Sequence, residues 1–99
     1  MASIQQNLTA GVVSVVPLDA PTGRIVVTYQ AGTTEAYVSV DGSLPVVPTP
    51  GVEVPTQQNA LPAVVGAQTV LKPPLFGTHM VIPTVRMVSS GSPTISVEW

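Results

Sequence analysis

The chain has 99 residues, of which 44% are hydrophobic, 4% aromatic and 8% charged, and its formal net charge is -2. Its three basic residues cannot form the positive patch that nucleic-acid phosphates or anionic lipid headgroups require, so neither nucleic acid nor a membrane is an expected partner. Cysteine is absent from the sequence, which excludes disulfide bonds and thiolate metal sites as sources of stability.

The scarcity of charge predicts contact with other protein. A folded monomer of 10.2 kDa exposes about 5,300 Å² of surface, and three basic and five acidic side chains are available to cover it. Soluble monomers rarely leave large apolar patches uncovered, and such patches usually mark contact sites. We therefore expect much of the surface to face other protein, with neutral Ser, Thr, Gln and Asn side chains as the alternative source of solubility.

Residues 1–10 are mainly polar and lack the basic start and the apolar run of a secretory signal. We expect them to form a weakly structured tail or an arm, and the protein to stay in the compartment where it is made. The long uncharged stretch from Val54 to Leu71 is interrupted by prolines and amides, so no transmembrane helix is predicted. Residues 11–99 are expected to form a single domain.

Eleven prolines and eight glycines interrupt the chain, and no stretch long enough for a stable helix repeats its apolar residues every 3.6 positions or so, about one helical turn. An all-β fold is therefore predicted. Runs rich in β-branched residues predict about seven strands, over residues 11–16, 24–30, 34–40, 52–54, 63–71, 79–88 and 94–99. Short strands with frequent turns favour a small antiparallel β-sandwich, for which a jelly-roll-like and an immunoglobulin-like strand order both remain open.

Two turn signals predict antiparallel hairpins. The sequence Ala31-Gly32-Thr33 is expected to join the second predicted strand to the third. The serines and glycine at residues 89–92 are expected to join the last two predicted strands. In the last strand, Ile95, Val97 and Trp99 alternate with polar residues, so that their shared face is predicted to point into the core.

Residues 44–62, LPVVPTPGVEVPTQQNALP, are unlike the rest of the chain and are called the strap below. Five prolines favour extended or polyproline geometry, and Val46, Val47, Val52 and Val54 supply apolar side chains. The strap is expected either to pack on its own domain as a long ordered connection or to reach a neighbouring subunit as an arm. In the second case these valines contact the partner, together with Trp99, for which the edge of the core is the other expected place.

No pattern of residues points to catalysis. His79 is the only histidine, and neither a nucleophile motif nor a phosphate-binding loop accompanies it. Glu35 and Asp41 share a strand face, but a straight strand places them about 20 Å apart, too far for paired-carboxylate chemistry. Asp19 and Asp41 each stand alone in a turn, whereas calcium needs about six to eight oxygen ligands. We expect no enzymatic activity, no cofactor and no bound metal.

A small, cysteine-free, charge-poor β domain with the ending VRMVSSGSPTISVEW resembles the capsid decoration (cement) proteins and other small structural proteins of tailed bacteriophage virions. The resemblance implies a non-enzymatic protein that is made in the host cytoplasm and sits at symmetric positions on the capsid surface, often as a trimer. It implies binding to major capsid protein or other virion proteins, through apolar burial and main-chain pairing from an extended arm.

The alternative is a carbohydrate- or host-surface-binding β-sandwich of a phage tail or a secreted scaffold. Tyr37 is the candidate platform for such a ligand, because it shares a strand face with Glu35 and Ser39. A strap that folds back on its domain, with polar groups around Tyr37, favours this module. An extended strap with protruding apolar side chains favours the structural protein.

Overall fold

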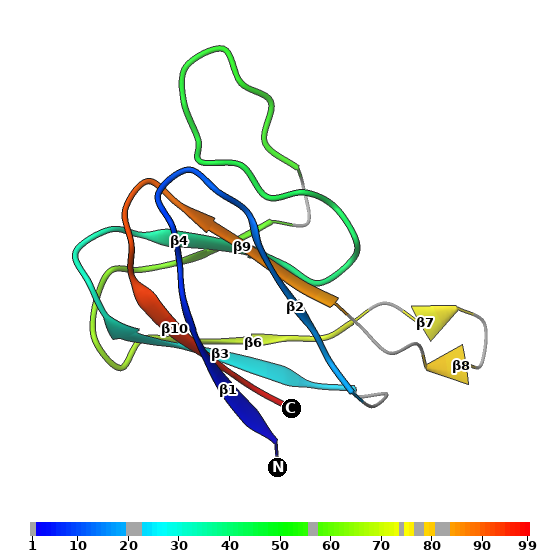
Figure 1. The fold of residues 1–99 in the computed structure, drawn as a ribbon. Helices are drawn as coiled ribbons and strands as arrows, with labels where there is room; N and C mark the ends of the chain where they lie inside the picture. Colours follow the sequence, from blue (N-terminus) through cyan, green and yellow to red (C-terminus); the bar gives the residue numbers. More distant parts are fainter. Residues whose placement is uncertain (1, 20–22, 56–57, 74, 77–78, 81–83) are drawn as a thin grey trace.

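The computed structural model describes residues 2–19, 23–55, 58–73, 75–76, 79–80 and 84–99, and every regular element within them is a β-strand (Figure 1). The predicted all-β sandwich is confirmed. The first of two antiparallel sheets has the strand order β1 (Ser3–Asn7), β10 (Thr94–Glu98), β3 (Ile25–Ala31) and β6 (Gln68–Leu71). The second has the order β2 (Ser14–Pro17), β9 (Thr84–Ser89), β4 (Ala36–Ser39) and β5 (Asn59–Leu61). A separate pair is formed by β7 (Leu75–Phe76) and β8 (His79–Met80).

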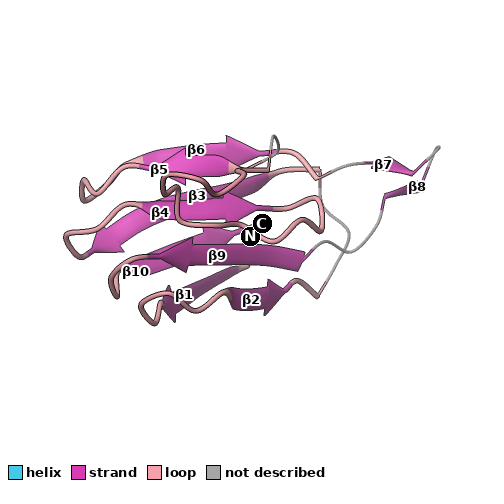
Figure 2. Cartoon of the chain, turned by 90° about the horizontal axis from the view of Figure 1, so that it is seen from above, coloured by secondary structure: helices cyan, strands magenta, loops and turns pink. Residues whose placement is uncertain are grey.

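The two sheets lie face to face, with β6 over β5, β3 over β4, β10 over β9 and β1 over β2 (Figure 2). Within the sandwich the pairs are nested, since β1 pairs with β10, β2 with β9, β3 with β6 and β4 with β5. This nesting results when one long antiparallel hairpin is rolled up into two sheets. It is the strand order of a jelly roll, and it differs from the immunoglobulin order.

Both predicted hairpins are wrong, because the strands that they would join lie in different sheets. The connection from β3 to β4 crosses the sandwich, and so does the connection from β9 to β10. The two connections pack on each other: the Ser89 hydroxyl donates to the Glu35 carbonyl at 2.8 Å, and Gly91 lies against the Thr34 side chain. A turn signal shows where the chain reverses, but it does not show whether the next strand stays in the same sheet.

The N-terminal residues form an edge strand where a tail or arm was expected. Ser3–Asn7 is β1, and the pairing continues to Ala2 and Trp99, which exchange two main-chain hydrogen bonds of 2.9 and 3.0 Å. The two sheets therefore hold eight strands, one more than predicted. An edge strand is held by main-chain pairing and needs little apolar alternation, so a polar sequence does not reveal it.

Other predicted strands differ in extent. Residues 52–54 are not a strand, whereas Asn59–Leu61, within the strap, is strand β5. Residues 63–66 bend and turn before β6. The predicted strand over residues 79–88 is divided into β8 and β9, and residues 81–83 between them lie outside the described residues.

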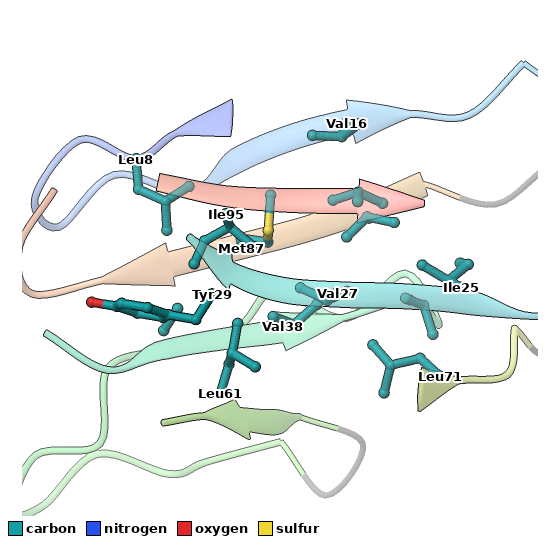
Figure 3. Close-up of a cluster of buried hydrophobic side chains, with 14 of the residues drawn as sticks. Leu8, Val16, Ile25, Val27, Tyr29, Val38, Leu61, Leu71, Met87 and Ile95 are labelled. Carbon is teal, nitrogen blue, oxygen red and sulfur yellow. The ribbon is translucent and has the colours of Figure 1, made fainter. Parts of the chain in front are cut away.

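The core lies between the sheets and follows the side-chain alternation of the strands (Figure 3). Its large, fully buried side chains are Ile25, Val27, Tyr29, Val38, Leu61, Val85, Met87, Ile95 and Val97. The Tyr29 hydroxyl donates to the Thr34 carbonyl at 2.7 Å, so its polar end has a partner. Burial of each such side chain contributes about 1.5–3 kcal/mol, so core packing is a main source of stability in a chain that has no cysteine.

Candidate functional site

The strap follows β4 and ends with β5, and the part before β5 projects beyond the sandwich as a long loop, green in Figure 1. Its first part lies on the domain, since Pro45 is buried and Val46 and Val47 are half-buried. Residues 48–54 are all exposed, and Val52 and Val54 within them are 48% and 40% exposed. The base of the strap thus packs on its own domain, while its outer part presents two valines to the surroundings.

A single side chain closes the base of the strap. The Gln58 amide accepts a hydrogen bond from the Val46 N–H through Oε1 and donates one to the Val46 carbonyl through Nε2, both at 2.7 Å. The amide pairs with the main chain of Val46 as a neighbouring strand would. Because the two residues are 12 positions apart, the segment between them is fixed at both ends.

The tip of the strap is a tight turn over residues 49–52. The Val52 N–H donates to the Thr49 carbonyl at 3.1 Å, and Gly51 has a positive φ of 82°. Proline followed by glycine at the two central positions is typical of a type II turn, in which the second central residue needs the left-handed region. The tip is therefore held in a defined turn conformation by the chain itself.

A polar cluster holds the chain where it leaves β4 for the strap. Asp41 Oδ1 accepts hydrogen bonds from the Ser43 hydroxyl at 2.6 Å, the Ser39 hydroxyl at 2.8 Å and the Ser43 N–H at 3.0 Å. These bonds hold the pKa of the Asp41 carboxyl below its ordinary value, and the bond from the Ser43 hydroxyl contributes most. Arg86 Nη1 donates to the Gly42 carbonyl at 2.8 Å and ties the same bend to β9.

Trp99 packs on its own domain. Its side chain is half-buried against the core, and its indole N–H donates to the Asp19 carboxylate at 2.9 Å. Of the two expected places for this residue, the structure puts it at the edge of the core. A contact of its remaining exposed surface with a partner stays a prediction.

Tyr37 lies on the outer face of the second sheet. Its register partners there are Val88 of β9 and Ala60 of β5, both apolar. Burial raises the pKa of the Tyr37 hydroxyl, and the negative charge of Glu35 adds to the shift. The half-buried ring is therefore set between apolar neighbours on its own face of the sheet.

Exposed hydrophobic side chains also occur at sites that sequence reasoning missed. They are Leu44 in the strap, Ile4, Val12 and Val15 in or near β1 and β2, and Val64, Val65 and Val70 in or near β5 and β6, and they are 41–69% exposed. A signal existed in runs such as Val15-Val16, because adjacent residues of a strand point to opposite faces. Val16 is buried at 3% exposure, whereas Val15 is 52% exposed.

The described residues contain no group of three or more His, Cys, Asp or Glu side chains that could hold a metal ion. In the same part of the chain there is no helix of the length and apolar character needed to cross a membrane. His79 opens β8, and its side chain lies outside what the structure describes. The exposed large hydrophobic side chains of the described residues lie on the strap and in or near the edge strands of the sandwich.

Comparisons with protein-family models, with curated proteins and with solved structures found no match to this chain. The jelly-roll order alone does not select a function, because capsid and lectin domains share it. What distinguishes this chain is therefore its surface, and above all the strap.

Proposed function

We propose that this chain is a non-enzymatic structural protein of a virion, a capsid decoration protein that binds major capsid protein or other virion proteins on the shell. The observation that carries the proposal is the outer part of the strap. There, seven consecutive exposed residues, 48–54, present Val52 and Val54 from a base fixed to the domain. A preformed apolar projection suits a groove between the subunits of an assembly.

The rest of the surface supports contact with protein. The chain exposes 5437 Å², close to the value of about 5,300 Å² that a compact monomer of this mass exposes. Three basic and five acidic residues are spread over this area, and nine large hydrophobic side chains are exposed among the described residues. Apolar side chains left uncovered in such numbers favour an interaction surface.

Burial of Val52 and Val54 would drive the contact. Full burial of a valine contributes about 1.5–3 kcal/mol, and roughly half of each side chain is already covered, so about 1 kcal/mol remains for each. One such contact is weak. A shell presents the same groove many times, however, and a homo-oligomer that engages several grooves at once gains by multivalency.

The test is co-sedimentation of the purified protein with capsids that are assembled without it, from the phage that encodes it. Replacing Val52 and Val54 by threonine keeps their shape and removes apolar surface, so we expect the bound amount to fall by roughly tenfold. Val64→Thr with Val65→Thr makes the same change outside the outer part of the strap, beside β5 and β6, and is expected to lower the bound amount clearly less than the strap variant does. If the strap variant co-sediments as the wild type does, the strap is not the contact. If the wild type does not co-sediment with capsids, the decoration role is contradicted.

The carbohydrate- or host-surface-binding alternative is favoured by one observation, the partly exposed ring of Tyr37 on an outer sheet face. Sugar sites combine such a ring with hydrogen-bonding groups, and the register partners Val88 and Ala60 offer none from their side chains. Glycan-array binding that Tyr37→Ala abolishes and the strap variant retains would favour this alternative.

A further inference from the structure

β1 is an edge strand with no described strand on its outer side, and we infer that a second copy of this chain pairs with it, antiparallel, across a two-fold axis. The first sheets of the two copies then form one continuous sheet. This dimer does not depend on the proposed role on a capsid, because it forms between purified copies alone. Its failure and the failure of capsid binding are therefore separate results.

Alternate residues of β1 direct their main-chain groups toward the free side. The Ala2 N–H donates to the Trp99 carbonyl and the Leu8 N–H donates to the Pro93 carbonyl, both at 2.9 Å, so both groups point toward the β10 side. Residues that pair by hydrogen bonds in an antiparallel ladder alternate with residues that do not. The even-numbered residues of β1 therefore direct their main-chain N–H and C=O groups toward β10. The N–H and C=O groups of Ser3, Gln5 and Asn7 therefore point away from the sandwich and can pair with another strand.

β1 lacks the features that usually protect an edge strand from pairing. It contains no charged residue and no proline, and its register with β10 is unbroken over residues 3–7. The other edges of the sandwich are shorter: β2 ends at Pro17, β5 is followed by Pro62, and β6 leads into Lys72. Among the described edge strands of the two sheets, β1 is the longest.

The strand is complementary to itself. With the axis at Gln5, this residue faces its own counterpart, and Ser3 of each copy faces Asn7 of the other. All three residues point their main-chain groups outward, so the three pairs form about six hydrogen bonds. The sequence SIQQN is neutral, and therefore no like charges meet at the axis. A two-fold contact of this kind closes on itself and stops at two copies.

Other registers form fewer bonds. An axis at Ile4 or Gln6 keeps the alternation but pairs fewer of the outward groups. If the axis passes between two residues, odd-numbered residues of one copy lie opposite even-numbered residues of the other. The main-chain groups of the even-numbered residues already bond to β10, so these pairs form no hydrogen bonds. The register at Gln5 also places Gln6 of the second copy opposite Ile4, which is 41% exposed in the single chain.

The test is the native mass of the full chain, measured by sedimentation over a concentration series, in which we expect the wild type to pass from one copy to two. Gln5→Lys and Gln5→Glu each place like charges opposite each other, so each variant alone is expected to raise the dimer dissociation constant by roughly fivefold or more. A mixture of the two variants restores the dimer, because opposite charges then meet. Gln68→Lys makes the same change on β6 and is expected to leave the mass unchanged.

Gln5→Pro removes the hydrogen bonds without adding charge. Both bonds of the central pair use Gln5 N–H groups, whereas the ladder to β10 does not, so β1 stays in its sheet. We expect at least a roughly tenfold loss of dimer affinity and a nearly unchanged unfolding midpoint of the monomer. A wild type that is monomeric at every concentration, or an oligomer of any size that none of the Gln5 variants weakens, overturns the inference.

Discussion

Gly32 is held between Pro93 and Tyr29 where the chain crosses from β3 to β4. Its φ is 129°, and a Cβ there would lie 2.8 Å from both the Pro93 Cα and the Tyr29 hydroxyl oxygen. Gly32→Ala is therefore expected to cost about 3 kcal/mol of unfolding free energy, since backbone strain and overlap add. Gly66 also has a positive φ, 92°, but has open space around it, so Gly66→Ala is expected to cost only about 1 kcal/mol. Equal losses in chemical denaturation would contradict this explanation.

Asp41 gives the stability a dependence on pH. Because hydrogen bonds from Ser43 and Ser39 lower its pKa in the folded state, its contribution is complete above the ordinary carboxyl pKa and is lost as the pH falls through the lowered value. The exposed position limits the contribution to about 1 kcal/mol or less. We expect the difference in unfolding free energy between wild type and Asp41→Asn to be largest near neutral pH and to vanish in strong acid. Glu53→Gln controls for the loss of one negative charge, and a difference that does not change with pH would contradict this role for Asp41.

The strap is an element whose shape depends on one amide. Gln58→Leu removes both bonds to Val46 and leaves the half-buried main chain of Val46 without that partner, so we expect a loss of about 1–3 kcal/mol. We also expect protease to cut residues 48–54 faster, because their base is no longer fixed. Limited proteolysis measures the rate, with Gln68→Leu on β6 as the matched control. Cleavage as slow as in the wild type would show that the remaining contacts of the base are sufficient.

The faces of the central strands follow from the sequence, whereas their partners do not. Ile95 and Val97 are predicted to share a face that points into the core, and both are fully buried there. Alternation is a local property, so a short window of sequence is enough to predict it. The partner of a strand is fixed by packing of the whole sandwich, as in the pairing of Ser3 with Glu98, and no local signal specifies it. The strap shows the same difference between local and long-range structure. Its prolines predict an extended chain, but no local signal predicts that the Gln58 amide bonds to the main chain of Val46.

On the scale of the whole molecule, a compact sandwich carries the outer part of the strap and the β7–β8 pair as projections (Figure 1). The radius of gyration is 12.9 Å, and a compact domain of about 100 residues has a value of about 13 Å. The charge count predicts that other protein covers the surface, and this stays a prediction. The described residues expose valines on the strap and at both edges of the sandwich. The count could not locate them, because exposure of a given valine depends on which strands become edges.

The direct pairing of Ala2 with Trp99 also sets how the molecule responds to mechanical load. A pulling force applied to these two residues acts at one end of the antiparallel ladder between β1 and β10, across the hydrogen bonds. The bonds then break one after another, as in a zipper, and never share the load. A tether attached at these residues would peel β1 away at low force, whereas anchoring through the strap would leave that ladder unloaded.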